Sequence, residues 1–300
     1  MAAGVLAREL QQGLQGEVRV DEPLAPYTTW RIGGPADLLA RPQSREDLEF
    51  CLEFSRQKSL PLHIMGNGSN LLIRDGGVRG MVIQTGAWGQ VEVAEPVVRC
   101  SAGVLMARVL KAATAAGLGG LEFMAGIPAT AGGAAVTNAG TPEGCLGDVI
   151  QGAAIITPAG GHLYLASRDI DFAYRYSSLR RAGTVIAVDL QLAATDPRAI
   201  RERVQANLAR RRARQPLEWP NAGSVFKNPP GHYAGRLIEA AGASGWQVGP
   251  AQVATKHANF IINRGRARAA DVLELINRIQ EAVARSFGIN LELEVEVWGE

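Results

Sequence analysis

Two glycine-rich segments of the chain have the residue types that a bound phosphate or a flat cofactor requires. The first, 66–70, can bring successive backbone N–H groups close to an anion, because glycine accepts positive φ and has no side chain to block the approach. It departs from the P-loop, since no Lys-Ser/Thr pair follows, and from the dinucleotide fingerprint, since a strand is expected next. A plain tight turn is the competing interpretation. The residues of this loop are Gly66, Asn67, Gly68, Ser69 and Asn70.

The second segment, 126–140, has too many small residues to fill a core and too few polar turn-forming residues to be a linker. A flat, bulky cofactor lying against the backbone would fill the space, and close backbone packing of two elements explains the composition equally well. Two such segments in one chain favour a dinucleotide.

Three positions carry side chains that could stabilise charge or move a proton. Arg175 stands among aromatic residues, where its guanidinium could hold a carboxylate bidentately or could simply stack on the rings. Ser224 precedes Lys227 by three residues in a turn-rich stretch and could donate a proton, although serine is also a common turn and cap residue. Glu294 belongs to an alternating stretch, 291–297, which predicts a strand with its three carboxylates on one face, most simply a solvated face.

Hydrophobic periodicity predicts the elements that must position these residues. A short strand is expected on each side of the first glycine-rich loop. A long helix is expected to begin at the cap signal of Asp196 and Pro197, and Gly288 is expected to cap the last helix. The predicted helices cover 47–58, 104–116, 196–214, 234–241 and 270–287, and the predicted strands cover 60–64, 71–73, 97–100, 185–192, 259–262 and 291–297.

Composition and charge narrow the class of protein. With 300 residues, 47% of them hydrophobic and 20% charged, the chain has room for two or three packed units. The formal net charge of +2 provides no global field that would recruit nucleic acid or an anionic membrane. The arginine run 210–212 ends a predicted helix, where cations complement the helix dipole. We therefore expect neither a nucleic-acid partner nor a membrane partner.

Signals for export, membrane insertion, disulfides and metals are also weak. The N-terminal stretch 1–16 lacks the charged-then-apolar order of a secretory leader, and the nearly uncharged stretches 123–142 and 149–167 are broken by glycine and proline. Neither the cysteines nor the four histidines have the spacing of a disulfide framework or a zinc site. We expect a cytoplasmic protein without a bound metal and with reduced, mostly buried cysteines. These are Cys51, Cys100 and Cys145.

In combination, these features resemble the UDP-N-acetylenolpyruvoylglucosamine reductases, which belong to the larger group with the vanillyl-alcohol-oxidase type of FAD-binding domain. The resemblance covers nearly the whole chain, and the order and spacing of seven motifs make it specific. The motifs are YTTWRIGGPAD at 27–37, GNGSN at 66–70, the small-residue segment at 126–140, FAYRYS at 172–177, GSVFKNP at 223–229, KHANFIIN at 256–263 and LELEV at 291–295.

The resemblance implies an α+β fold with a two-subdomain FAD-binding domain at 1–195, divided near residue 85, and a C-terminal α+β substrate-binding domain at 196–300. It implies an enzyme with tightly bound, non-covalent FAD that takes hydride from NADPH. The small-molecule substrate would be UDP-N-acetylglucosamine enolpyruvate, reduced to UDP-N-acetylmuramate for peptidoglycan. The residues expected to bind the cofactor are the five of the first loop together with Ile127, Pro128, Gly132, Gly133, Asn138 and Gly140.

The same resemblance implies three catalytic residues. Arg175 would supply the cation at the substrate carboxylate, Ser224 would protonate the carbon as a general acid, and Glu294 would hold the site in its proton-bearing or polarised state. Lys227 is a candidate proton relay or electrostatic helper. The candidates for binding the UDP-sugar are Arg214, Lys227 and Asn228.

Two departures and two rival functions accompany this prediction. Asn67 stands where the family more often places glycine, and the run from Tyr176 to Val185 leaves no room for the inserted loop that folds a tyrosine over the substrate in one branch. The chain therefore resembles the shorter branch. One rival is an FAD-dependent alcohol or sugar oxidase of the same fold, whose covalent-flavin variants would need His63. The other is a non-catalytic nucleotide-sugar binding protein, which would need no proton donor such as Ser224.

Overall fold

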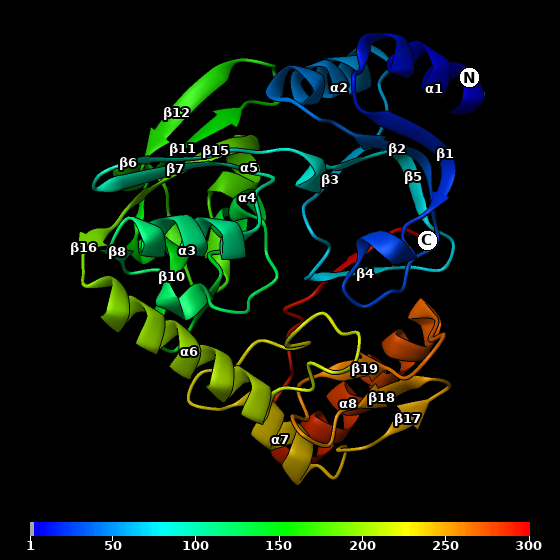
Figure 1. Cartoon of the computed structure of the whole chain (residues 1–300). Coiled ribbons are helices and arrows are strands. Elements are labelled where there is room, and N and C mark those ends of the chain that lie inside the picture. The colour runs from blue at the N-terminus through cyan, green and yellow to red at the C-terminus, as the bar shows by residue number, and fades with distance from the viewer. Residues whose placement is uncertain (1–2) are drawn as a thin grey trace. The chain divides into compact units, whose positions relative to one another are not determined.

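The structure, a computed structural model, describes residues 3–300 and divides into two compact units (Figure 1). The first unit comprises the residues up to Val20 together with Leu38–Asn67 and Gly80–Arg211. The second unit comprises Asp21–Asp37, Gly68–Arg79 and Arg212–Glu300. Each unit is therefore assembled from segments that are distant in the sequence.

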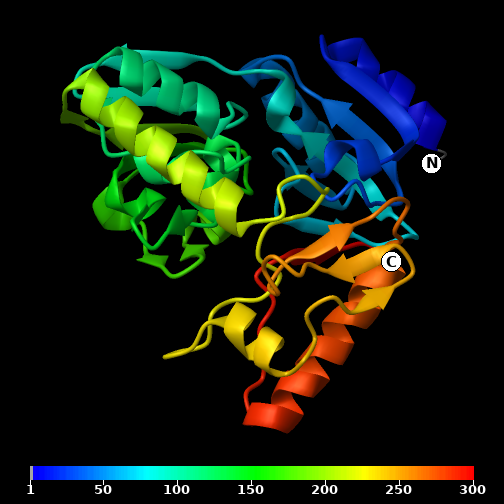
Figure 2. The same cartoon turned by 60° about the horizontal axis from the view of Figure 1, so that its bottom comes forward.

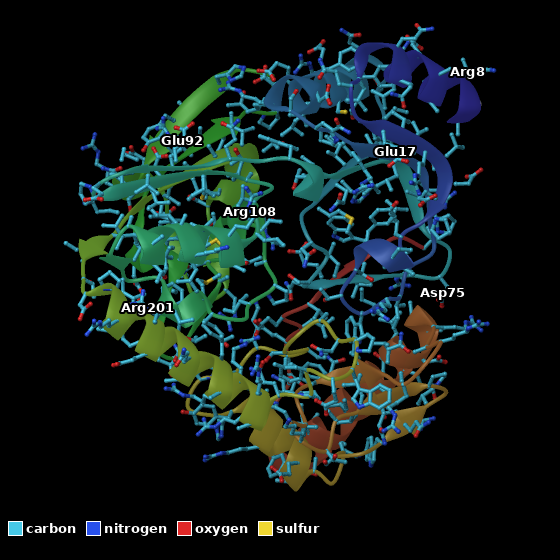
Figure 3. The ribbon with its side chains drawn as sticks, viewed as in Figure 1. Arg8, Glu17, Asp75, Glu92, Arg108 and Arg201 are labelled. Carbon is cyan, nitrogen blue, oxygen red and sulfur yellow. The ribbon has the colours of Figure 1, made fainter. Side chains whose placement is uncertain are left out.

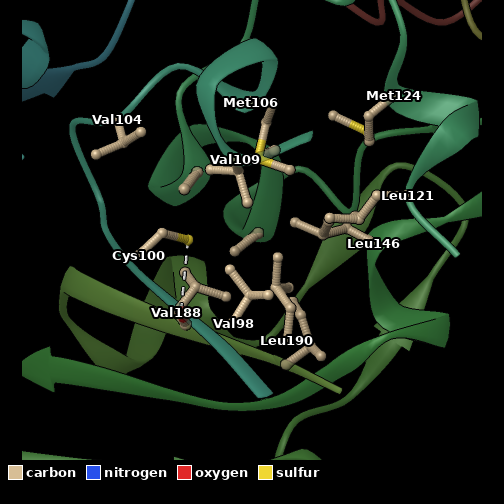
Figure 4. Packing of buried hydrophobic residues seen from close by; sticks show 14 of the residues in the cluster. Val98, Cys100, Val104, Met106, Val109, Leu121, Met124, Leu146, Val188 and Leu190 are labelled. Carbon is tan, nitrogen blue, oxygen red and sulfur yellow. Dashed lines mark hydrogen bonds between the residues drawn. The ribbon is translucent and has the colours of Figure 1, made fainter. Parts of the chain in front are cut away.

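A five-stranded antiparallel sheet, in the order β12-β11-β15-β7-β6, lies at the centre of the first unit. The helices α3 (Met106–Ala115) and α4 (Ala131–Val136) pack against it. The residues buried there are almost all apolar, and Figure 4 shows Val98 and Val188 on two of the strands packing with Met106 and Leu146. The strands are β6 (Val91–Ala94), β7 (Val97–Ser101), β11 (Ile150–Ile156), β12 (His162–Ala166) and β15 (Thr184–Gln191).

A second apolar cluster of the first unit forms around the helices α1 (Ala3–Gly13) and α2 (Arg45–Gln57). The helix α2 begins at Ser44, whose hydroxyl accepts a hydrogen bond from the Asp47 N–H at 3.1 Å. The accompanying sheet has the order β1-β2-β5-β3, in which β3 and β5 are parallel. Its strands are β1 (Glu17–Pro23), β2 (Pro35–Arg41), β3 (Leu62–Met65) and β5 (Val78–Gln84).

The second unit is built around the helix α8 (Ala269–Phe287), drawn in orange beside the short strands in Figure 2. Its apolar residues recur at helical spacing and are buried, and the helix ends at Gly288 in a left-handed conformation with φ 68°. Trp30 is fully buried in the same cluster and donates from Nε1 to the Ile261 carbonyl at 2.8 Å. The other elements of this unit are α7 (Ala234–Ala240), the antiparallel strands β17 (Gln247–Val248), β18 (Ala251–Val253) and β19 (Ile261–Asn263), and the parallel pair β4 (Leu71–Ile73) and β20 (Glu296–Trp298).

The remaining elements are short, with the exception of the helix α6 (Pro197–Arg214). They include the four-residue helix α5 (Leu179–Ala182), which leads directly into β15. Three two-stranded pairs join β8 (Leu118–Gly119) to β16 (Ala193–Ala194), β9 (Gly140–Thr141) to β10 (Gly144–Cys145), and β13 (Phe172–Ala173) to β14 (Tyr176–Ser177). The 3₁₀ turns are η1 (Ala25–Tyr27), η2 (Thr85–Ala87), η3 (Glu122–Met124), η4 (Leu146–Asp148) and η5 (Ser167–Asp169).

All five predicted helices are present, as are the strands on both sides of the first glycine-rich loop. The predicted strand at 291–297 is wrong. Only β20 is regular there, and Leu293 makes an isolated bridge with Phe226. The chain bends at Glu294 because its N–H donates to the Val225 carbonyl at 2.8 Å. The predicted face of three carboxylates consequently does not form.

Several general expectations can be compared with the described residues. All three cysteines are free, and burial raises the pKa of both Cys51 and Cys100 to about 12, as expected for buried, reduced thiols. Across residues 3–300 no helix combines the length and the apolarity needed to cross a membrane. Within the same residues, no group of three or more His, Cys, Asp or Glu side chains could hold a metal ion.

Candidate active site

The beginning of the first glycine-rich loop lies against the second segment within the first unit. The side-chain amide of Asn67 donates to the Pro128 carbonyl at 2.8 Å. A Cβ added to Gly66 would lie 2.1 Å from the Thr130 hydroxyl, so only glycine fits there without a shift of that side chain. The Gln84 amide donates to the Gly66 carbonyl at 3.2 Å. Two segments that are sixty residues apart in the sequence therefore form one surface.

The remainder of that loop belongs to the second unit. Gly68 has a φ of 59°, the left-handed conformation that glycine adopts without strain, and its carbonyl accepts from the Thr29 N–H at 3.3 Å. The hydroxyl of Thr29 is buried and has no hydrogen-bond partner among the residues that the structure describes. A buried polar atom without a partner costs free energy unless a ligand satisfies it. Backbone N–H groups of the loop, the Ser69 side chain and the Thr29 hydroxyl are hydrogen-bond donors of the kind that a pyrophosphate would need.

The small-residue segment owes part of its composition to close packing. A Cβ on Gly132 would lie 2.7 Å from the Ala102 Cβ, so the backbone of α4 approaches β7's end more closely than a side chain would allow. Gly133 has only the Thr130 hydroxyl, at 3.2 Å, near the corresponding position. Thr130 caps α4 by accepting from the Gly133 N–H at 3.4 Å. The packing explanation is correct for Gly132 and does not account for Gly133.

Asn138 joins this segment to the next candidate residue. It is buried with a φ of 45°, its amide donates to the Ala173 carbonyl at 2.9 Å, and its oxygen accepts from the Gly147 N–H at 2.8 Å. The side chain is therefore used by the protein itself. Ile127 packs against the adjacent apolar cluster. Any contact of these two residues with a cofactor has to involve the Asn138 backbone or the exposed part of Ile127.

Arg175 lies at the turn between β13 and β14, in the first unit. Its φ of 56° is uncommon for a residue other than glycine, and such strained positions gather at functional sites. The guanidinium donates to the Gly140 carbonyl at 3.0 Å, and its Cζ lies 5.2 Å from the centre of the Tyr174 ring. The arginine is thus stacked on an aromatic ring and held at the end of the small-residue segment.

Ser224 is presented by a stretch of the second unit that is fixed on both sides. Upstream, the Gly223 N–H donates to the Asn221 side chain at 2.9 Å, and Gly223 has a φ of 77°. Downstream, Phe226 is fully buried and exchanges two hydrogen bonds with the Asn259 side chain, at 2.9 and 2.8 Å. Ser224 itself is half-buried, and its hydroxyl bonds to none of the described residues. The backbone on both sides of Ser224 is therefore fixed, while its hydroxyl makes no hydrogen bond to the described residues.

The structure brings Glu294 beside this stretch. The Glu294 N–H donates to the carbonyl of Val225, the residue that follows Ser224. The Asn70 amide donates to the Glu294 carbonyl at 3.0 Å, and the Glu296 N–H donates to the Asn70 carbonyl at 2.9 Å. Within one unit, hydrogen bonds from the backbone and from the Asn70 side chain therefore join the end of the first glycine-rich loop to Glu294, and Glu294 to Val225, the residue after Ser224.

The residues suggested for the UDP-sugar have different surroundings. The Lys227 amine lies 3.3 Å from the Glu292 carboxylate, and both side chains are accessible to solvent. The Asn228 side chain accepts from the Ala234 N–H at 3.0 Å, which satisfies a donor at the start of α7. Arg214 is exposed at the end of α6. Lys227 and Arg214 are accessible cations, whereas Asn228 has a role in the fold.

Comparison with known proteins identifies the families to which two parts of the chain are similar. Residues 36–166 match the FAD binding domain family, and residues 215–298 match the C-terminal domain family of UDP-N-acetylenolpyruvoylglucosamine reductase. The UDP-N-acetylenolpyruvoylglucosamine reductase of Moorella thermoacetica is 64% identical over 98% of this chain and 98% of its own length.

Solved structures agree with both the fold and the family. The crystal structure of UDP-N-acetylenolpyruvylglucosamine reductase from Thermus caldophilus has a TM-score of 0.81 and 38% identity, and the match covers 95% of this chain and all of that one. Alkyldihydroxyacetonephosphate synthase, at 18% identity and a TM-score of 0.50, shares the fold over 64% of this chain and 40% of its own. The predicted α+β fold with an FAD-binding domain of the vanillyl-alcohol-oxidase type and a further C-terminal domain is confirmed. The chain belongs to the UDP-N-acetylenolpyruvoylglucosamine reductase family.

Proposed function

We propose that this protein is an FAD-dependent oxidoreductase that reduces UDP-N-acetylglucosamine enolpyruvate to UDP-N-acetylmuramate, with NADPH as the hydride donor, in peptidoglycan precursor synthesis. The observation that carries the proposal is the surroundings of Ser224, whose hydroxyl bonds to none of the described residues. The next residue, Val225, is hydrogen-bonded to the Glu294 backbone, which in turn is bonded to Asn70 of the glycine-rich loop. This arrangement occurs in a chain that is 64% identical, end to end, to a reductase of that name. The proposed location is the cytoplasm, with small molecules as the partners.

FAD, when bound, would supply the hydride chemistry that links oxidation of NADPH to reduction of the enolpyruvyl group at its methylene carbon. The residues proposed to hold it are the first loop and the positions of the small-residue segment named above. Hydride addition leaves negative charge on the adjacent carbon and on the carboxylate. The Ser224 hydroxyl is proposed to donate its proton to that carbon, since its position is fixed on both sides.

Charge on the carboxylate requires a cation whose position is preset. Arg175 is proposed for this role, because its backbone is strained and its guanidinium is already oriented by the Gly140 carbonyl and the Tyr174 ring. Glu294 is proposed to polarise the proton donor, given its backbone link to Val225. The accessible cations Arg214 and Lys227 are proposed to attract the substrate diphosphate, and Asn228 to contact the sugar.

The domain assignment belongs to the same proposal. Residues 1–195 are proposed as the FAD-binding domain, divided near residue 85, and residues 196–300 as the substrate-binding domain. The FAD binding domain match at 36–166 and the C-terminal domain match at 215–298 lie inside these limits.

The test is to follow the flavin absorbance of the purified protein through two separate half-reactions. NADPH is expected to bleach the flavin, and the enolpyruvyl substrate is expected to restore its colour faster than oxygen does. Ser224→Ala is expected to leave the first step intact and to slow the second by about 10²-fold or more, the usual contribution of a positioned acid. The matched variant Ser244→Ala, in the loop after α7, is expected to change neither step.

Each alternative function has a distinct result in this assay. An oxidase would restore the flavin colour with oxygen and without the enolpyruvyl substrate. A binding protein would be colourless and would not take up FAD. Equal loss of both half-reactions in Ser224→Ala would assign the serine to the structure rather than to proton transfer.

A further inference from the structure

The helix α6 contains one arginine that differs from the other six. Seven of the residues in Pro197–Arg214 are arginine, and most are exposed, as Arg201 is in Figure 3. Arg211 is the single one of the seven that is not exposed. Its Nε is buried and has no hydrogen-bond partner within residues 3–300, and burial lowers the pKa of its guanidinium.

The same face of α6 shows what the chain provides for the neighbours of Arg211. Arg203, Asn207 and Arg211 follow one another at intervals of four residues and therefore share a face of the helix. The Arg203 guanidinium donates to the Glu122 carboxylate at 2.9 and 2.7 Å. The Asn207 amide donates to the Glu122 carbonyl at 2.9 Å. The first two side chains of this face are satisfied by one residue of the chain.

The Nε of the third side chain, Arg211, meets no acceptor in the described part of the chain. Four residues after Glu122 the chain reaches Gly126, and a Cβ added there would lie 3.1 Å from the Arg211 Nε and 3.3 Å from its Cδ. The nearby carboxylate of Glu143 forms an ion pair with Arg210 instead. Gly126 has a φ of 79°, so both its backbone and its lack of a side chain allow the approach of the arginine.

An uncompensated buried cation is unfavourable, and proteins pair such groups or give them a ligand. Gly126 is the first residue of the segment for which we propose FAD binding. Two residues later, the Pro128 carbonyl is bonded to Asn67 of the first glycine-rich loop. The unpaired guanidinium therefore lies at the edge of the surface formed by both segments, within one unit of the structure.

We infer that Arg211 pairs with a negatively charged group of bound FAD. The inference rests on the proposed function. Two parts of FAD have the required chemistry: the pyrophosphate, which is charged in both redox states, and the N1–C2=O edge of the isoalloxazine, which becomes negative on reduction. In either case the ligand supplies an acceptor for the Arg211 Nε, which has none among the described residues.

The experiment compares Arg211→Gln with Arg212→Gln, which removes an equal charge from the adjacent exposed position. FAD is removed from each purified holoprotein, and its dissociation constant, the reduction potential of the reloaded flavin and the melting temperature of the apoprotein are measured. Removing the hydrogen bonds of a charged group is expected to weaken the interaction about tenfold or more. Arg211→Lys, which keeps the charge but not the planar fork, is expected to recover part of the loss.

The two sources of negative charge give different results. A pyrophosphate partner predicts that Arg211→Gln raises the dissociation constant of oxidised FAD about tenfold and leaves the potential unchanged. An isoalloxazine partner predicts an almost unchanged dissociation constant for oxidised FAD and a potential lower by about 30 mV for each tenfold loss in the reduced state. In both cases the apoprotein is expected to melt at the same or a higher temperature, because the half-buried cation with its unpartnered Nε is gone.

The inference would be overturned if Arg211→Gln and Arg212→Gln bound FAD equally and had equal potentials. It would also be overturned if Arg211→Gln destabilised the apoprotein, since that result would show a structural role. Wild-type protein that binds no FAD would contradict the proposed function instead, and the two failures are therefore distinguishable.

Discussion

Asn259→Ala tests the claim that the fold fixes the position of Ser224. The Asn259 side chain is 3% exposed, and it both accepts from the Phe226 N–H and donates to the Phe226 carbonyl. Phe226 is 1% exposed, so the substitution leaves two buried backbone groups without partners. Each such group costs about 1–3 kcal/mol. We expect the free energy of unfolding to fall by about 2–4 kcal/mol, since water entering the cavity would offset part of the loss.

The catalytic effect is expected to be specific to one half-reaction. Ser224 lies two residues before Phe226, so its hydroxyl would lose its fixed position, and a displacement of about 1 Å can cost about 10²-fold in rate. Reoxidation of the flavin by the enolpyruvyl substrate should therefore slow by about tenfold to 10²-fold. Reduction by NADPH, which needs no proton from Ser224, should keep its wild-type rate. Urea unfolding measures the first effect and stopped-flow absorbance measures the second.

Asn263→Ala is the matched control. Asn263 is 2% exposed and makes three side-chain hydrogen bonds, to the N–H groups of Gly265 and Ala267 and to the Trp30 carbonyl, none of which touches the stretch around Ser224. A similar loss of stability is expected, with no change in the ratio of the two half-reactions. If both variants change that ratio by the same factor, the effect is general destabilisation and the reasoning about Ser224 is refuted.

Three further predictions concern contacts in the first unit. Gly66→Ala should weaken FAD binding by displacing Thr130, and adding Thr130→Ala should restore part of the affinity; no recovery in the double variant would contradict the steric explanation. Asp189 is buried, which alone would raise the pKa of its carboxyl, but the bidentate hydrogen bonds from Arg99 outweigh this and lower it. The resulting stabilisation is complete above the unfolded-state pKa near 4 and is lost as pH falls through the lower folded-state value, so Asp189→Asn should flatten the acid side of the stability curve measured by urea unfolding. The thiol of Cys51, whose pKa burial raises to about 12, should resist alkylation at pH 8 until the protein unfolds, and rapid labelling of the native protein would show that this site opens.

Local signals in the sequence were sufficient for the regular elements. The helical spacing of the apolar residues in α8 and the glycine at its end are enough to predict that helix from its own sequence. The stretch 291–297 has an equally clear period of two, yet it is not a strand. Its backbone is committed to two different partners, Val225 on one side of the bend and β4 on the other. Periodicity reports which residues are apolar and cannot report that a chain changes partners midway.

The parts of the candidate site that depend on residue type could be predicted from the sequence. The parts that depend on a polar atom lacking a hydrogen-bond partner could not. The sequence shows directly that there are glycine-rich segments, an arginine among aromatic residues and a serine in a turn-rich stretch. The orphan hydroxyl of Thr29 and the orphan Nε of Arg211 are not visible in it, because a missing partner exists only in three dimensions. The run 210–212 looks like a solvated helix end in the sequence, and that interpretation holds for Arg210 and Arg212.

The sequence nevertheless contains a spacing pattern from which the unusual surroundings of Arg211 could have been predicted. Arg203, Asn207 and Arg211 have the four-residue spacing of one helix face, and Glu122 and Gly126 have the same spacing on the facing segment. Glu122 serves the first pair, Arg203 through its carboxylate and Asn207 through its backbone carbonyl, but Gly126 has no side chain to serve Arg211. This helix face has three polar side chains, whereas the facing segment has one acid and one glycine, so the face lacks a side-chain acceptor. The donor without an acceptor lies at the start of the small-residue segment, for which we propose cofactor binding. The same count of donors and acceptors, made between a charged helix and a glycine-rich segment, identifies the residue for which we propose a negatively charged ligand.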